Sequence, residues 1–221
     1  MAGLRDQNKA KRRDAILDAA VALLGRSASE DVTTDEIAAL AGVSPATVYN
    51  LVGTREDLMH AVVERVLRQL AESLGALDPA DPIAAAQLVV DQTVKAFVAD
   101  PTAYRQVVAF AQRASAGRTG LDPSSFQVEA MQRAQAMGII RDDVDAAGLG
   151  RQIFVSYVGA MMLWSAGRLD DTGFLVAAQH GLATALAAAA TDAHRDELVR
   201  RMRPLGVALE RDAWHQQALR P

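Results

Sequence analysis

Two helix breaks within seventeen residues constrain the fold of this chain more than any other feature of its sequence. Residues 41–57 read AGVSPATVYNLVGTRED, with a glycine on each side of a Ser-Pro step. Gly42 can adopt the left-handed conformation that ends a helix at low cost. Ser44 then caps a new helix whose first residue is Pro45, where the missing N–H removes no hydrogen bond. Gly53 ends this helix, so it has room for only about seven residues.

Capping patterns predict a helix on either side of this short one. Thr33 lies three residues ahead of Glu36, the spacing of a capping box, and an apolar face follows. Thr54 caps the next helix, with Asp57 at a similar spacing. A short helix held by a glycine turn against a capped predecessor is the helix-turn-helix arrangement. From turn spacing alone, an ordinary helical hairpin remains the alternative.

Helical spacing of apolar residues continues along nearly the whole chain. No run rich in Val, Ile and Thr between turn signals indicates a strand, so we predict an all-α fold. The first helix is expected to run from about Lys11 to Arg26, after a basic arm. Further helices are expected over about 55–74, 83–99, 101–115, 124–137, 145–167 and 171–191, and over 193–214 with a break at Pro204 and Gly206.

Composition excludes several classes of site. Half of the 221 residues are apolar, which is enough for a sizeable core, and there is no cysteine. The chain therefore has no disulfide, no Cys-ligated zinc and no thiol nucleophile, and four scattered histidines are a thin basis for a metal site.

The same composition bears on location in the cell. The charged N-terminus leaves no apolar core for an export signal, so we expect a cytoplasmic protein. Residues 152–167 and 172–191 contain no Asp, Glu, Lys or Arg. The first segment is too short to span a membrane and the second is rich in weakly apolar alanine. We predict core helices here and no membrane partner.

The segments RRDAILDAAVALL and VTTDEIAALAGVSPATVYNLVGTREDLMHAVV resemble the DNA-binding domain of the tetracycline-repressor (TetR) family. The resemblance covers about residues 12–66, with a threonine at 33, AGVS at 41–44, a tyrosine at 49 and a basic residue at 55. An aromatic residue common in the family around positions 51 and 52 is replaced here by Leu51 and Val52.

The resemblance implies an all-helical homodimer with two domains. We place an N-terminal three-helix helix-turn-helix DNA-binding domain, with its basic arm, at residues 1–56. A C-terminal helical ligand-binding and dimerisation domain would occupy residues 57–221. The family implies a regulator of transcription, usually a repressor that binds a palindromic operator and is released by a small-molecule effector.

Two kinds of contact with double-stranded DNA are predicted for the helix-turn-helix. Hydroxyl groups, the Arg55 cation and N–H groups at helix N-termini suit phosphates. The Asn50 amide suits an adenine edge, and Ala46 and Thr47 suit a thymine methyl. For Tyr49 the alternative to a phosphate contact is a half-buried core ring. The expected DNA-binding residues are Thr33, Thr34, Ser44, Pro45, Ala46, Thr47, Tyr49, Asn50 and Arg55.

Net charge does not by itself favour a nucleic-acid partner. Residues 1–60 contain 7 Lys and Arg against 9 Asp and Glu, and the whole chain carries −4. A local basic cluster of Arg5, Lys9, Lys11, Arg12 and Arg13 precedes the first predicted helix. It is either an arm that follows the DNA backbone or minor groove, or a solvated tail.

The C-terminal half predicts a dimer interface and an effector site. The helix over 145–167 is apolar on almost every side, and the helix over 171–191 is rich in small residues. The resemblance implies that both pair with their copies as a four-helix bundle, so we predict a homodimer; an intramolecular core is the alternative. We expect no cofactor other than a hydrophobic or aromatic effector. The residues expected to line its site are Phe97, Tyr104, Phe110, Phe126, Met131, Phe154, Tyr157 and Met161.

Other function classes are weighed against this prediction. Asp142, Asp143 and Asp145 form a carboxylate cluster, but acidic caps are expected at the helix start where they lie. No Gly-rich phosphate loop, Ser nucleophile motif or metal-ligand spacing is present, so we predict no enzyme. The remaining alternatives are a helical protein-interaction scaffold without DNA binding and a transcriptional activator of the same fold. Residues 193–221 either cover the dimer interface or form a mobile tail.

Overall fold

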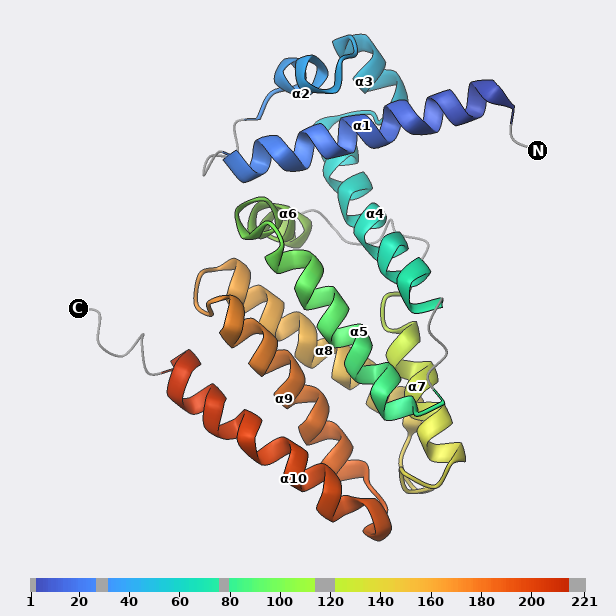
Figure 1. Cartoon of the computed structure of the whole chain (residues 1–221), viewed down its shortest axis with the longest axis vertical. Helices are drawn as coiled ribbons and strands as arrows, with labels where there is room; N and C mark the ends of the chain where they lie inside the picture. The colour runs from blue at the N-terminus through green and yellow to red at the C-terminus, as the bar shows by residue number, and fades with distance from the viewer. Residues whose placement is uncertain (1–2, 27–31, 76–79, 114–121, 215–221) are drawn as a thin grey trace. The chain divides into compact units, whose positions relative to one another are not determined.

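The computed structural model describes residues 3–26, 32–75, 80–113 and 122–214 (Figure 1). Within these ranges the regular structure is helical apart from one isolated β-bridge, so the predicted all-α fold is confirmed. The helices are α1 (Leu4–Arg26), α2 (Thr34–Ala41), α3 (Pro45–Leu51), α4 (Arg55–Gly75), α5 (Pro82–Val98), α6 (Pro101–Arg113), α7 (Ser125–Ala136), α8 (Ala146–Ser165), α9 (Asp171–Ala189) and α10 (Asp192–Ala208), followed by a π-helical segment over Leu209–Trp214.

The chain forms two compact units, and each has its own core. Within the described residues, the first unit contains α1, α2, α3, α6 and α4 as far as Arg68, together with the end of α5 from Phe97. The second contains the remainder of α4 and α5 with α7, α8, α9 and α10. The boundary predicted between residues 56 and 57 divides the chain by expected function and stays a prediction.

The core of the first unit is built on the apolar stripe of α1. Ile16, Leu17 and Ala20 are buried at helical spacing, and side chains from α2, α3, α4 and α6 close around them. α2 and α3 lie on one side of α1 (Figure 1). On α6, the Gln106 side-chain amide donates to the Leu24 carbonyl at 3.1 Å. Removing each large apolar side chain from water contributes about 1.5–3 kcal/mol, so this core holds the short helices in place.

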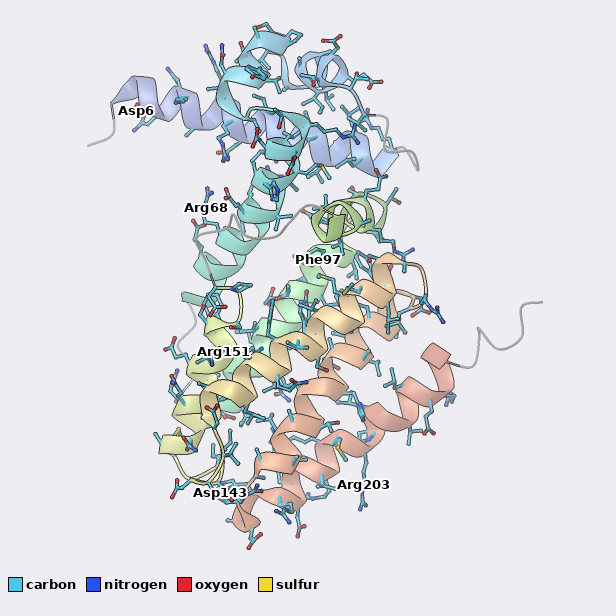
Figure 2. All side chains as sticks on the ribbon, turned by 180° about the vertical axis from the view of Figure 1, so that it is seen from behind. Asp6, Arg68, Phe97, Asp143, Arg151 and Arg203 are labelled. Atoms are coloured by element: carbon cyan, nitrogen blue, oxygen red, sulfur yellow. The ribbon has the colours of Figure 1, made fainter. Side chains whose placement is uncertain are left out.

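The first helix begins earlier than predicted. α1 starts at Leu4, so the basic segment expected as an arm is helical, and Asp6 marks the first turn (Figure 2). An acidic residue in the first turn is favourable, because the N-terminus of a helix carries partial positive charge. The prediction placed the start where apolar periodicity begins, although polar residues such as Lys9 and Lys11 continue a helix at little cost.

The second unit is organised around α8 and α9. α8 packs against both α7 and α9, and α9 also contacts α10, so α9 lies between α8 and α10 (Figure 1). Trp164 of α8 stacks on Phe174 of α9 with ring centroids 5.2 Å apart. The Trp164 indole N–H donates to Asp171 Oδ1 at 2.8 Å, which satisfies the polar end of this buried ring.

Among the described residues, one face of α8 is buried and another is exposed. Ile153, Tyr157 and Trp164 are buried at helical spacing. On another face of the helix, Val155 is 58% exposed and Met162 is 44% exposed. The sequence predicted a helix that needs burial on both faces, and the second apolar face therefore remains available to a partner.

The last helix is continuous where a break was predicted. α10 runs through Pro204, which is exposed and lies inside the helix. Proline removes one helical hydrogen bond, but contacts with α9 hold the chain on both sides of it. Leu198 is buried before the proline, and Gly206 after it lies against the His180 ring of α9. α10 thus covers α9, whereas residues 215–221 lie outside the described residues.

The sequence of α9 raised the question of whether this helix spans a membrane. Among the described residues it is the helix long and apolar enough, by length and composition, to cross a membrane. Phe174, Leu182 and Leu186 are nevertheless buried, and both α8 and α10 pack against the helix. These contacts are those of a core helix, as predicted.

Candidate nucleic-acid interface

The start of α2 has the predicted capping box. The Thr33 N–H and hydroxyl donate to Glu36 Oε2 at 2.9 and 2.8 Å, and the Glu36 N–H donates to Thr33 Oγ1 at 3.2 Å. These hydrogen bonds hold the pKa of Glu36 below its ordinary value. Thr33 and Thr34 are both exposed, so the first turn of α2 faces solvent.

The start of α4 is capped in the same way and is tied to α2. The Thr54 N–H and hydroxyl donate to Asp57 Oδ2 at 2.9 and 2.7 Å. Arg55, the first residue of α4, donates from its guanidinium to the Val32 carbonyl at 2.9 Å, immediately before the cap of α2. This contact brings the N-termini of α2 and α4 together, and both carry partial positive charge. The sequence did not predict it, because the partners are 23 residues apart.

α3 presents a continuous exposed face between these two helices. Ser44 caps it, Pro45 is its first residue, and Gly42 closes α2 with a φ of 66°. Val48 is 2% exposed and anchors α3 in the core of the first unit. Pro45, Ala46, Tyr49 and Asn50 all lie on the exposed side. Four of the residues predicted to meet DNA therefore share one surface.

Two side chains of α3 are further defined by their surroundings. Tyr49 is 65% exposed, so the alternative of a half-buried core ring is excluded, and its contact with a phosphate stays a prediction. Thr47 is half-buried, and its hydroxyl lies 2.8 Å from the Ser44 hydroxyl. The Thr47 methyl group takes no part in this hydrogen bond and remains the group suited to a thymine methyl.

The basic residues near the N-terminus lie on α1 rather than in an extended arm. Lys9, Lys11 and Arg12 are exposed and Arg13 is half-buried. Their spacing spreads them around the helix, so they form a diffuse positive surface. Such a surface suits the sequence-independent attraction of phosphates.

The residues predicted for an effector site fall into both units. In the first unit, Phe97 and Tyr104 form an edge-to-face pair with ring centroids 5.3 Å apart. The side chain of Phe110 lies outside the described residues. In the second unit, Met131 is fully buried, whereas Phe126 and Met161 are half-buried.

The second unit also brings together an aromatic cluster. The Tyr157 ring lies 6.4 Å from Phe154 and 5.8 Å from Phe174, centroid to centroid. Tyr157 is only 9% exposed, its hydroxyl has no partner among the described residues, and burial raises its pKa. Gln127 Oε1 is likewise buried without a partner, while its amide N–H donates to the Ala86 carbonyl. The sequence prediction missed Phe174 and Gln127, since neither belongs to a motif.

The carboxylate cluster considered for catalysis has structural roles. Asp145 caps α8 and accepts a hydrogen bond from the Gly148 N–H at 3.0 Å. Asp143 accepts one from the Arg141 guanidinium at 3.0 Å. In the part of the chain that the structure describes, no group of three or more His, Asp or Glu side chains is placed to hold a metal ion.

The capping box of α2 predicts how the stability of the protein changes as the pH falls. Because the folded pKa of Glu36 lies below its ordinary value of 4.5, the cap stabilises the protein above that pH. This stabilisation is lost as the pH falls through the folded pKa. Thermal melting of the wild type and of Glu36→Gln should differ at pH 7 and converge in acid. A difference that persists unchanged in acid would contradict the assignment of this carboxylate.

Comparison with known proteins agrees with this geometry. The family described as "Bacterial regulatory proteins, tetR family" matches residues 16–62, which include α2, α3 and the beginning of α4. The HTH-type transcriptional regulator BetI of Brucella anthropi is 40% identical over 65 residues. That match covers 29% of this chain and 34% of the relative, so it is confined to about a third of the relative's length.

Solved structures extend the similarity of fold to most of the chain. A gamma-butyrolactone receptor (ArpA-like protein) aligns with a TM-score of 0.60 at 21% identity, covering 90% of this chain and 98% of that one. Thermus thermophilus FadR, a TetR-family repressor in complex with lauroyl-CoA, aligns with a TM-score of 0.63 at 18% identity, covering 79% and 93%. Both alignments support an N-terminal helix-turn-helix domain followed by a helical domain.

Proposed function

We propose that this protein belongs to the tetR family of bacterial regulatory proteins, whose model matches residues 16–62, and that it regulates transcription by binding DNA. The observation that carries the proposal is the exposed face of α3, which includes Tyr49 and Asn50 and is held between two capped helices. A short helix presented in this way enters the major groove with its N-terminal residues at the bases. The N-termini of α2 and α4, linked by Arg55, offer N–H groups to flanking phosphates.

Specificity would rest on few direct contacts. α3 contains no Arg or Lys, so the bidentate guanine contact that is commonest in DNA recognition is missing from it. Asn50 can pair with adenine, and Ala46 can contact a thymine methyl. Bridging waters and DNA shape would supply the rest of the discrimination.

Selection of bound duplexes from a random pool tests this proposal. A dimeric regulator should enrich an inverted repeat whose half-sites lie about 34–36 Å apart, or a multiple of that distance. If no sequence were enriched, a helical scaffold that binds only protein would be favoured. The enriched site would then be placed near a reporter promoter. We propose that the protein lowers expression of the reporter, whereas an activator would raise it.

Two exposed residues of α3 should separate phosphate contacts from base contacts. Tyr49→Phe removes a hydroxyl assigned to a phosphate and should weaken binding to operator and to random DNA by similar factors. Asn50→Ala removes a group assigned to a base edge and should cost about 1–3 kcal/mol on operator and little on random DNA. Fluorescence anisotropy with both duplexes measures the two effects. An Asn50→Ala variant with unchanged operator preference would show that the base-reading residues are assigned wrongly.

The exposed apolar face of α8 supports a homodimer. Val155 and Met162 lie on that face with Gly159 between them, at the spacing of one helical stripe. Gly159 has open space around it, which permits close approach of a second helix. We propose that α8 and α9 pair with their copies across a twofold axis, so that two copies of α3 can read the two half-sites.

The effector proposed here is a hydrophobic or aromatic small molecule without a cofactor role. The aromatic cluster of Phe154, Tyr157 and Phe174 supports an apolar ligand. The buried Tyr157 hydroxyl and Gln127 Oε1 are polar groups that a ligand could satisfy. Since coupling between two sites is reciprocal, operator DNA must weaken effector binding by the factor by which the effector weakens operator binding. A ligand from a thermal-shift screen that binds equally with and without operator would not be the effector.

A further inference from the structure

A cavity of about 330 Å³ is present in the first unit, apart from the residues assigned to the effector site. Its apolar wall consists of Ala20, Leu24, Ile37, Val48, Leu58 and Met59, and each of these is at most 5% exposed. The volume lies within the range of small-ligand pockets, at its lower end. A ligand that fits it must therefore be small and largely apolar.

The mouth of this cavity is polar and includes the Arg55 cation. Thr33, Thr34, Thr54 and Arg55 line it, and all four residues are exposed. Thr34 and Arg55 are the first residues of α2 and α4, where backbone N–H groups point out of the helix. The guanidinium of Arg55 stays charged at every physiological pH and can bind a carboxylate through two parallel hydrogen bonds. An anionic head group on an apolar tail matches this combination.

Two carboxylates near the mouth limit the charge of that head group. Glu36 and Asp57 each accept hydrogen bonds from their own capping threonine, so their negative charges are held beside the helix N-termini. Both carboxylates repel any anion at the mouth, and the repulsion of a dianion is about twice that of a monoanion in the same position. The mouth therefore favours a carboxylate over a phosphate monoester.

We propose that this cavity binds a medium-chain carboxylate. Its alkyl chain would contact the apolar wall, and its carboxylate would lie at Arg55 and the N-termini of α2 and α4. The bound carboxylate would occupy the groups to which we assign DNA phosphates, so it would compete with DNA directly. The competition rests on the proposed DNA-binding function, whereas binding in the cavity does not.

Chain length should determine affinity, because the alkyl chain carries most of the contact. Each buried methylene contributes about 0.8 kcal/mol, which corresponds to about fourfold in affinity. Octanoate should therefore bind about fifteenfold more tightly than hexanoate. Octanol has the chain without the charge and should bind more weakly than octanoate. Acetate has the charge without the chain and should not bind measurably.

Methionine methyl groups report where octanoate binds. Met59 lines the cavity, whereas Met131, Met161 and Met162 lie in the second unit. With ¹³C-methyl methionine, titration of the full chain with octanoate should shift the Met59 signal, which Met59→Leu identifies. If only the signals of the second unit moved, or none moved, the cavity site would be wrong.

Substitutions that fill the cavity should weaken octanoate binding while Arg55 itself is left unchanged. Ala20→Leu adds three carbons at the apolar wall and Val32→Phe adds a ring near the mouth, where Val32 also lines the cavity. A filling variant whose melting temperature equals that of the wild type is folded, and it should bind octanoate at least tenfold more weakly. The shift of the Met59 methyl signal measures this affinity. Ala136→Leu, at an exposed site of the second unit, is the matched control and should bind normally. Equal octanoate affinity in a folded filling variant and in the control would overturn the proposal.

Anisotropy of a random-sequence duplex tests the competition. Octanoate should displace this duplex from the wild type and from Ala136→Leu but not from Ala20→Leu. If the wild type binds no duplex while octanoate still shifts Met59, the DNA-binding function fails and the cavity site stands. If DNA binds and octanoate shifts Met59 without displacing it, the competitive mechanism is overturned.

Discussion

Replacing both Val155 and Met162 with aspartate is expected to yield a monomer and to weaken operator binding by about 10²- to 10⁴-fold. Both side chains belong to the exposed apolar face of α8. An aspartate buried there without a partner would lose its hydration, which opposes association. The affinity falls because two linked recognition helices bind two half-sites as one event, whereas separate monomers bind them independently. Sedimentation velocity at micromolar concentration measures the oligomeric state, and anisotropy measures operator affinity.

The chain offers a matched control for this double variant. Val207 of α10 is 64% exposed, so Val207→Asp places the same charge on another exposed apolar position. It should leave both the dimer and operator binding unchanged. If the double variant sedimented as a dimer, the face of α8 would not be the interface.

Replacing Gly150 with alanine is expected to lower the free energy of unfolding by about 1–3 kcal/mol or more. A Cβ atom at this position would lie 2.5 Å from the Cα of Val128 and 2.8 Å from the carbonyl carbon of Gln127. These are backbone atoms of α7, so rotation of a side chain cannot relieve the clash. α7 and α8 would have to move apart, which would disturb the buried core of the second unit.

Gly159→Ala is the control for this substitution, since Gly159 lies on the same helix with open space around it. Alanine favours a helix interior by about 1 kcal/mol over glycine, so this variant should be slightly more stable. Urea unfolding followed by circular dichroism measures both. Both alanine substitutions are made in the Val155→Asp, Met162→Asp double variant, so that dissociation of a dimer does not contribute to the measured free energy of unfolding. Equal stabilities for the two alanine variants would contradict the close packing of α7 and α8.

The helix-turn-helix could be predicted because its boundaries depend on local chemistry. Thr33 with Glu36, Ser44 with Pro45, and Gly42 with its positive φ each act within a few residues of sequence. Hydrogen bonds at such short separation form in the same way wherever the segment folds. The exposed positions of Tyr49 and Asn50 then follow from the burial of Val48 on the opposite side of α3.

Predicted helix boundaries were wrong where tertiary contacts outweigh a local helix breaker, and where a helix continues without an apolar pattern. Pro204 is a helix breaker by itself, yet the packing of α10 on α9 outweighs the hydrogen bond it removes. The early start of α1 had no apolar periodicity to indicate it, because Asp6, Gln7 and Asn8 are polar and exposed.

The sequence by itself determined the all-helical class, the caps of the helix-turn-helix and the apolar character of α8. Each of these depends on residue spacing within one or two helical turns. The tertiary structure alone decided the contact of Arg55 with the Val32 carbonyl, the aromatic cluster around Tyr157 and the cavity beneath Thr33 and Arg55. These features join residues far apart in the chain. Their distances depend on how whole helices pack, and no local pattern specifies that packing.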